Sequence, residues 1–408
     1  MDKKRIIFAS GFLLLTAVFG FLIYKVFFAK EKITIKKKVT PTEQVGGQFP
    51  TAQEGGLTPT IVTPGAGLPQ AGTVSPGAAI TPAGGPGLAK VKKELDAELS
   101  GLKVGTNGET NFYNQTDGKF YHRTPTGDIT PLSDQTFYGV DKVTWSPTSN
   151  ESVIEYPDGS NILYNFTTKK QISLPKHWEE FSFSPQGEQI AAKSVGLSPE
   201  NNWLIVSDPT GKNIKLVEAM GENAKKVSVA WSPNNQVIAL SRTGQVLGDD
   251  RQEILFVGQN KENFRSTIVE GRGFESQWSP DGQQLLYSVF SARSNYKPEL
   301  WIVNAEGDNI GTGRKLLNIN TWSNKCTFGN DRFIYCAVPA ELEVGSGFAP
   351  ALAKTTLDQL WKIDIKTGLK SQIAVEGSHT VEQLFIDKVN EKLLFTDANL
   401  TGLYSVDL

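Results

Sequence analysis

Short apolar stretches that alternate with turn-forming residues recur along most of the chain. Stretches such as 226–231 (KVSVAW) and 273–278 (GFESQW) end in an aromatic residue, and a Ser-Pro turn follows. A second β-rich stretch comes next, as in 285–290 (LLYSVF), and then a third and a short fourth. Because no long helical pattern intervenes, the sequence predicts antiparallel sheets of four strands each.

The aromatic-Ser-Pro phrase repeats along the chain at spacings of 38, 48, 47, 44 and 63 residues. Its copies stand at Trp145, Phe183, Trp231 and Trp278, with weaker ones at Trp322 and Phe385. This period of about 40 to 50 residues is typical of propeller blades. A single small sheet cannot bury both of its faces, whereas a ring of such sheets can. We therefore predict an all-β fold over residues 102–408, a β-propeller of six or seven blades whose ring is closed by strands from both ends.

A different pattern precedes the repeats. Residues 6–28 are apolar except for Lys25, and at ~1.5 Å of rise per residue they are long enough to span a bilayer core of ~30 Å. The rival interpretation is a cleaved signal peptide, because Lys3, Lys4 and Arg5 precede the run. The run is longer than a signal-peptide core and no A-x-A-like cleavage site follows it. We predict an uncleaved transmembrane anchor over residues 1–38 with its basic flanks, and an extracytoplasmic propeller.

Two further segments join this anchor to the repeats. Residues 39–89 are rich in Thr-Pro, Pro-Gly and Gly-Gly pairs and bury too little apolar surface to order themselves, so they predict a disordered linker. Over residues 90–101, Val91, Leu95 and Leu99 recur at helical intervals and Gly101 follows. This spacing predicts a short amphipathic helix.

The phrase is most complete at 278–282 (WSPDG), and it resembles that of the TolB-like and WD-repeat-like β-propellers of bacteria. The copies at Trp145 and Trp231 keep the Ser-Pro turn without its glycine. The resemblance covers about residues 105–408, and the anchor, linker and propeller together are similar to membrane-anchored members of that group. Such propellers act mainly as interaction platforms, so the resemblance implies binding; the fold alone would not establish that function.

Composition removes several kinds of chemistry from consideration. The formal charge is −2, with 41 basic and 43 acidic residues, so we expect no nucleic-acid partner. The three histidines His122, His177 and His379 stand far apart, and no G-x-S-x-G, Walker A, EF-hand or H-E-x-x-H motif occurs. We expect no cofactor, no metal and no catalytic residues.

Two short acidic or aromatic stretches are candidate sites. Asp249 and Asp250 are the only adjacent acidic pair of interest for glycan cleavage, and a solvated turn is the stronger interpretation. His177 and Trp178 join two predicted blades, and there we expect Trp178 to pack between blades while His177 lies in a turn.

The two cysteines, Cys326 and Cys336, flank a turn signal at 329–331. Each lies five residues from position 331, so in a simple hairpin they face each other within disulfide reach. A bridge would agree with an exported domain, and a pair of buried free thiols is the alternative.

The longest interruption of the strand pattern runs from 339 to 358. It contains Phe348, Pro350 and Leu352, which predict an exposed apolar cluster. Loops of this length in a compact domain are usually functional or disordered. We interpret it as a candidate partner-binding loop at one mouth of the propeller, against a flexible insertion without a role.

Taken together, these patterns favour a non-catalytic, membrane-anchored propeller at the cell envelope that binds a protein, peptide or glycan. The alternatives are a glycan-active extracytoplasmic enzyme that uses the propeller channel, and a structural component of an envelope assembly.

Overall fold

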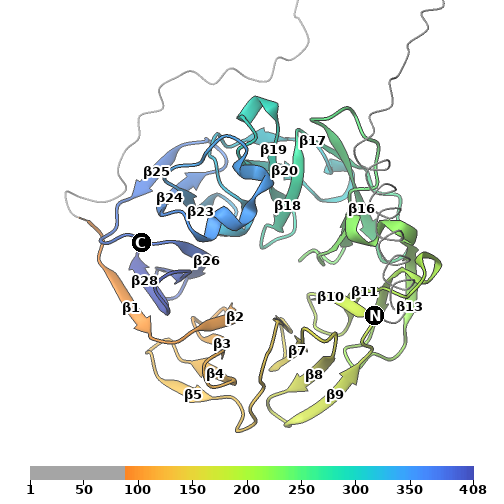
Figure 1. Cartoon of the computed structure of the whole chain (residues 1–408), viewed down its shortest axis with the longest axis horizontal. Helices are drawn as coiled ribbons and strands as arrows, with labels where there is room; N and C mark the ends of the chain where they lie inside the picture. The colour runs from red at the N-terminus through yellow and green to blue at the C-terminus, as the bar shows by residue number, and fades with distance from the viewer. Residues whose placement is uncertain (1–87) are drawn as a thin grey trace, which may run out of the picture. The chain divides into compact units, whose positions relative to one another are not determined.

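The computed structural model describes residues 88–408, which form a ring of seven four-stranded antiparallel sheets (Figure 1). The predicted all-β propeller is confirmed, and of the two predicted blade counts the structure has seven. The predicted anchor helix at 6–28 and nearly all of the predicted linker lie outside the described residues. From residue 88 to residue 408, no helix is both long and apolar enough to cross a membrane.

Blades 1 to 4 each place their first strand at the centre of the ring and their last at the rim. Blade 1 consists of β2 (Leu99–Val104), β3 (Thr110–Asn114), β4 (Lys119–Arg123) and β5 (Ile129–Pro131). Blade 2 consists of β6 (Lys142–Trp145), β7 (Glu151–Glu155), β8 (Asn161–Asn165) and β9 (Lys170–Leu174). Blade 3 consists of β10 (Trp178–Phe183), β11 (Ile190–Ser194), β12 (Trp203–Ser207) and β13 (Lys215–Ala219). Blade 4 consists of β14 (Val227–Val229), β15 (Val237–Ser241), β16 (Gln252–Gly258) and β17 (Thr267–Val269).

Blades 5 and 6 repeat this order, and blade 7 departs from it. Blade 5 consists of β18 (Arg272–Trp278), β19 (Gln284–Phe290), β20 (Glu299–Asn304) and β21 (Lys315–Leu316). Blade 6 consists of β22 (Cys326–Phe328), β23 (Phe333–Pro339), β24 (Asp358–Asp364) and β25 (Lys370–Ile373). Blade 7 consists of β26 (Val381–Asp387), β27 (Lys392–Asp397), β28 (Leu403–Asp407) and, at the rim, β1 (Val91–Leu95).

Seven short 3-10 helices lie in the connections of the described chain. They are η1 (Pro199–Asn201), η2 (Gly221–Lys226), η3 (Ala292–Ser294), η4 (Gly307–Asn309), η5 (Ser323–Lys325), η6 (Ser346–Phe348) and η7 (Pro350–Lys354).

The Ser-Pro phrase forms the tight turn between the first two strands of a blade. In blade 5 the Gly282 N–H donates to the Ser279 carbonyl (2.9 Å), and the buried Ser279 hydroxyl accepts from the Gln284 N–H (2.9 Å). Gly282 has φ +72°, which favours glycine. Asn235 takes the same place in blade 4 with φ +63°, because asparagine tolerates this conformation. Glycine and asparagine therefore both fit the positive-φ position of this turn.

Two of the three tryptophans of the phrase link neighbouring blades, whereas Trp231 Nε1 donates to Asn235 Oδ1 of its own turn at 2.7 Å. Trp145 Nε1 of blade 2 donates to the Gly101 carbonyl of blade 1 at 2.6 Å. Trp278 Nε1 of blade 5 donates to the Ala230 carbonyl of blade 4 at 3.1 Å. Each of these two indoles thus packs between blades while its polar edge satisfies a backbone carbonyl beside the channel.

The apolar core is divided among the contacts between blades. Seven separate clusters of buried residues each combine side chains from two adjacent blades, including one that joins Leu394 and Leu403 of blade 7 to Leu102 and Phe112 of blade 1. Each sheet therefore buries both faces against its neighbours, as the ring prediction requires.

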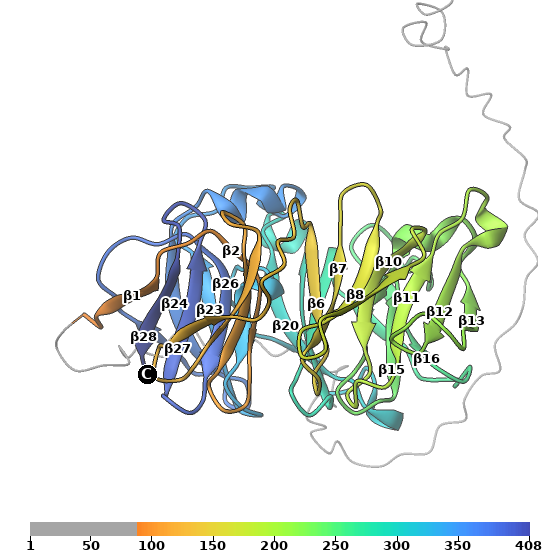
Figure 2. The same ribbon diagram turned by 90° about the horizontal axis from the view of Figure 1, so that it is seen from below.

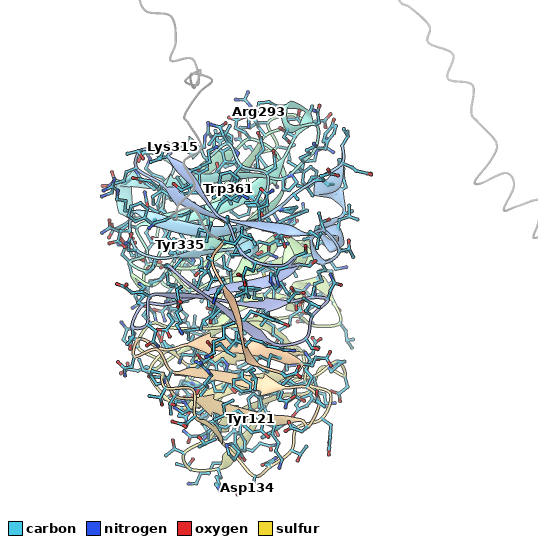
Figure 3. All side chains as sticks on the ribbon, turned by 90° about the vertical axis from the view of Figure 1, so that its left-hand side faces the viewer. Tyr121, Asp134, Arg293, Lys315, Tyr335 and Trp361 are labelled. Atoms are coloured by element: carbon cyan, nitrogen blue, oxygen red, sulfur yellow. A yellow bond between two sulfur atoms is a disulfide. The ribbon has the colours of Figure 1, made fainter. Side chains whose placement is uncertain are left out.

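The ring closes where the two ends of the described chain meet, as predicted. β1 pairs with β28 from Val91↔Val406 to Leu95↔Leu403, so the first strand completes the last blade. Figure 3 shows this strand crossing the rim between Tyr335 of blade 6 and Tyr121 of blade 1.

The predicted amphipathic helix at 90–101 is wrong. Residues 91–95 are β1 and residues 99–104 are β2, so the propeller begins before residue 102. Val91, Leu95 and Leu99 have a helical spacing, but they form strands instead. The reason is that the outer edge of β28 and the inner edge of β3 each offer a ladder of backbone hydrogen-bond partners. Gly101 does not end a helix; it has φ +55° at an irregularity within β2.

Candidate interaction face

The two faces of the ring differ in their loops. We call the face where the innermost strand of each blade begins the upper face; it lies at the top in Figure 2. Alternating strand direction places the loops between the second and third strands of each blade on this same face.

Exposed apolar side chains gather on the upper face. Among residues 88–408, 18 large apolar side chains are exposed, and nine of them lie in upper-face loops. These nine are Tyr138, Leu197, Val246, Leu247, Val344, Phe348, Leu352, Leu357 and Leu400. Five of the nine are spread over the loops of blades 1, 3, 4 and 7, and the other four share one loop. Exposed apolar residues that cluster as these four do, rather than scatter singly, mark interaction sites.

Four of the nine belong to one loop, residues 340–357 between β23 and β24 of blade 6, which we call the blade 6 loop. Phe348 is 57% exposed and Leu352 42% exposed, and Pro350 is exposed at the first position of η7. The structure thus brings the three sequence-predicted loop residues together on the surface. Val344 and Leu357, which the sequence analysis did not select, add to the same exposed set.

The blade 6 loop is held against blade 5. The Gly347 N–H donates to the Tyr296 carbonyl (2.8 Å) and the Gly345 N–H to the Asn295 carbonyl (2.9 Å). The Phe348 ring lies 4.5 Å from the Phe290 ring, centroid to centroid. A Cβ at Gly347 would come within 2.4 Å of that Phe290 ring, so only glycine fits there. The loop is therefore a shaped platform with exposed apolar tips.

A buried ion pair lies beneath the loop. Lys325, at the end of η5, places its Nζ 2.7 Å from Asp358 Oδ2 and 2.8 Å from the Ala353 carbonyl of η7. The Val381 N–H also donates to Asp358 Oδ2 (2.8 Å). The two charged side chains are 2% and 0% exposed. The pair ties the blade 6 loop to blades 6 and 7.

Burial dominates the electrostatics of this pair. It raises the pKa of Asp358 to about 6, although the Lys325 ammonium opposes the shift. Burial also lowers the pKa of Lys325, against the attraction of Asp358. Asp358 Oδ1 is buried without a hydrogen-bond partner among the described groups, which adds to the cost of the charged carboxylate.

A second polar pair adjoins the first. His379 Nδ1 lies 3.0 Å from Asp397 Oδ2, and the Asp358 N–H donates to the His379 carbonyl at 2.8 Å. Nearby, a hollow of about 190 Å³ is lined by Glu98, Glu382 and Asp397. Among residues 88–408, no three His, Cys, Asp or Glu side chains are placed to hold a metal ion.

Sequence reasoning missed both polar pairs. Lys325, Asp358, His379 and Asp397 come from η5, β24, the connection before β26 and the end of β27, so no local spacing connects them. In the sequence, His379 is only one of three histidines that stand far apart.

The cysteines face each other across β22 and β23. Cys326 and Cys336 are register partners with Cα atoms 4.0 Å apart, and their sulfurs lie 2.16 Å apart as a disulfide. The pair lies within the core cluster between blades 5 and 6, directly after η5, which carries Lys325.

The two candidate stretches, 177–178 and 249–250, lie in turns and in the packing between blades. Trp178 is buried between blades 2 and 3, and His177 is exposed in the turn before it. Asp249 is exposed on the upper face, where Arg272 Nε donates to its backbone carbonyl at 2.7 Å. These places agree with the packing and turn interpretations.

One carboxylate on the inner strands lacks a partner. Glu275 of β18 has a buried Oε2 without a hydrogen bond to any described group, and burial raises its pKa.

Comparison with solved structures supports the fold. No protein-family model matches the chain, and no curated protein matches it in sequence. The chain is similar to an oligogalacturonate lyase in complex with manganese (TM-score 0.53, 13% identity, 78% of this chain and 93% of the lyase). It is also similar to the β-propeller domain of Cps50 (Swd1) from Myceliophteria thermophila (TM-score 0.52, 10% identity, 78% and 99% covered).

A third similar structure is virginiamycin B lyase from Staphylococcus aureus (TM-score 0.50, 12% identity, 78% and 99% covered). At these identities the similarity shows the propeller fold, and it transfers no chemistry to this chain.

Proposed function

We propose that the protein is a non-catalytic binding propeller, anchored in the membrane through residues 6–28, that holds a protein or peptide partner on its upper face. The observation that carries the proposal is the gathering of exposed apolar side chains there, four of them on the blade 6 loop. A soluble domain gains nothing from exposing Phe348, whereas an interface uses such an aromatic side chain as an anchor.

The support of the loop strengthens the proposal. A loop without a role would not need Gly347 packed under the Phe290 ring or a buried lysine bonded to its backbone. Because these contacts hold the exposed side chains in place before binding, less conformational entropy is lost when a partner docks.

Paired serine substitutions test the proposal. Phe348→Ser with Leu352→Ser removes apolar anchors from the upper face, and the matched control is Leu369→Ser with Val389→Ser on the lower face (47% and 55% exposed). The control variant should keep the stability of the wild type to within about 0.5 kcal/mol per site, because both of its side chains are exposed. The upper-face variant should lose about 1 kcal/mol more, because Phe348→Ser also removes the ring contact with Phe290.

The readout is chemical cross-linking in native membranes, followed by quantitative mass spectrometry. The upper-face variant should recover the wild-type partners at least about tenfold less, and the lower-face variant should recover them unchanged. Equal recovery by both variants would refute an upper-face interface. Recovery of the chain from the soluble fraction would refute the anchor.

Glycan cleavage in the channel is the second candidate, and Glu275 is the observation that favours it. Glycosidases need a pair of carboxylates, one of them with a raised pKa. Glu275 provides a raised pKa, and Glu155 of β7 is a second carboxylate whose pKa burial raises. The two belong to blades 5 and 2, so they do not form a pair in one blade.

A further inference from the structure

Most cations in the upper loops of blades 5, 6 and 7 already have a counter-charge. The three blades are neighbours in Figure 1. Their upper loops are residues 291–298, 317–325, 340–357, 374–380 and 398–402, together with 96–98 between β1 and β2. The ion pairs of the loop cations are Arg293 with Glu299, Lys325 with Asp358, and Lys354 with Glu382. Lys297 is the one loop lysine or arginine that forms no such pair within the described chain.

The carboxylates of the same loops are mostly unpaired. Asp96 pairs with Lys93, and His379 is bonded to Asp397. The carboxylates that form no ion pair within residues 88–408 are Glu98, Glu341, Glu343 and Glu376. Four carboxylates therefore stand against the single ammonium of Lys297, and this part of the upper face has a surplus of negative charge.

Two of the unpaired carboxylates lie beside the exposed apolar side chains of the blade 6 loop. Glu343 directly precedes Val344, which is 72% exposed. Glu341 follows Ala340, whose N–H donates to the carbonyl of the exposed Leu357 at 2.8 Å. Both glutamates are themselves exposed. The loop therefore presents apolar side chains with negative charge at their margin.

The negative charge extends from the loop toward blades 7 and 1. Lys354, two positions after Leu352 in η7, reaches Glu382 of β26. Glu382 lines the hollow of about 190 Å³ together with Glu98 and Asp397, and no lysine or arginine takes part in that lining. The apolar loop is thus bordered by carboxylates on the side of the hollow as well.

We infer, on the basis of the proposed function, that the partner protein presents to the blade 6 loop a surface of apolar side chains flanked by lysine or arginine. Its apolar side chains pack on Phe348 and Leu352, and its cations meet Glu341 and Glu343. Complementary charge of this kind raises the rate of association and excludes partners of the wrong charge.

The surplus of carboxylates decides among occupants. If the same loops of two copies of the chain met, each would bring four unpaired carboxylates and one unpaired lysine in any relative orientation, so the two surfaces would repel each other. An anionic lipid surface would be repelled for the same reason. A neutral apolar ligand would gain nothing from the glutamates. A basic and apolar protein surface gains from both features of the loop.

The first measurement uses a phage-displayed library of random short peptides, panned on the full-length chain in non-ionic detergent after subtraction on empty micelles. The enriched peptides should combine aromatic or aliphatic residues with lysine or arginine. Phe348→Ser with Leu352→Ser should weaken their binding at least about tenfold. Enrichment of acidic or neutral peptides, or no enrichment, would overturn the inference.

The second measurement determines the affinity of one enriched peptide for charge variants of the full-length chain. Glu341→Gln with Glu343→Gln should weaken binding roughly three- to tenfold at low salt, because two exposed attractions are lost. Lys297→Gln should strengthen binding about twofold, since it removes the unpaired cation. Raising the salt from about 0.05 M to about 0.5 M should weaken binding to the wild type more than binding to the glutamine variant.

The matched control is Glu188→Gln with Asp331→Asn, at exposed turns of the lower face, and it should bind as the wild type does. Equal weakening by the control would overturn the inference in favour of non-specific attraction. Unchanged binding to the Glu341 and Glu343 variant, with binding lost in the Phe348 and Leu352 variant, would overturn the inference and leave the proposed function standing. Unchanged binding to both variants would overturn the proposed function itself.

Discussion

Lys325 and Asp358 form a buried pair on which the blade 6 loop rests, and the pair determines how that region responds to pH. In the folded chain the pKa of Asp358 is raised from 3.8 to about 6, mainly by burial. The folded state therefore binds this proton more tightly than the unfolded state does. The resulting stabilisation is complete below about pH 4 and is lost as the pH rises through about 6.

Asp358→Asn tests this sign. Two pKa units correspond to about 3 kcal/mol at most. Raising the pH from about 4 to about 7 should therefore lower the unfolding free energy of the wild type by up to that amount more than it lowers that of the variant. The measurement is urea unfolding of both proteins at the two pH values. Lys354, His379, Glu382 and Asp397 lie near Asp358 and are present in both proteins. Lys325 loses its counter-charge in the variant; a further fall of its pKa would stabilise the variant as the pH rises, so the sign of the expected difference is unchanged.

Asp331→Asn, at an exposed turn, is the matched control and should behave as the wild type does at both pH values. A constant difference in unfolding free energy between wild type and Asp358→Asn at the two pH values would contradict the raised pKa.

At the scale of the element, the β22–β23 hairpin shows how a short strand is held in place. β22 has three residues and pairs with only three residues of β23, but Cys326 and Cys336 are partners within that ladder. The sequence separation of the cysteines is 10, and closing a loop of about that size should stabilise the fold by roughly 2–3 kcal/mol.

We predict that the purified chain carries this bond. Mass spectrometry should show a gain of about two hydrogens on reduction of the unfolded chain, and the reduced protein should unfold at lower denaturant concentration. Cys326→Ser with Cys336→Ser serves as the control that no longer responds to reductant. An unchanged mass on reduction would rule the bond out.

At the scale of the whole molecule, β1 is the strand that closes the ring, and Glu94 is its polar attachment. The Glu94 side chain is 5% exposed, its Oε2 lies 2.9 Å from Arg123 Nη2 of blade 1, and its Oε1 accepts from the Ser405 hydroxyl of blade 7 at 2.8 Å. One carboxylate therefore connects the last blade to the first.

Glu94→Gln should destabilise the propeller by about 2–4 kcal/mol, because it leaves the buried Arg123 guanidinium without its counter-charge. Thermal and urea unfolding measure the loss, and Lys90→Gln, at an exposed position just before the same strand, is the control, with an expected change below about 0.5 kcal/mol. Adding Arg123→Met to Glu94→Gln should recover part of the loss. A Glu94 variant as stable as the wild type would mean that strand pairing alone closes the ring.

Much of the fold followed from local sequence. The phrase at Trp278 marks a turn whose geometry depends on Ser279, Pro280 and Gly282 themselves, and its period reflects one blade. These features are local because a tight turn and an alternating strand are decided by a few neighbouring residues. For the same reason the exposed cluster at Phe348, Pro350 and Leu352 could be predicted from the length and composition of its loop.

The chain alone therefore determined the strands, the turns, the ring and one exposed apolar loop. Only the tertiary structure decided that 91–95 is a rim strand of the last blade and that Lys325 meets Asp358. The reason is physical: each of these features depends on a partner supplied by a distant segment. Backbone pairing and burial of charge exist only once the ring has placed those segments side by side.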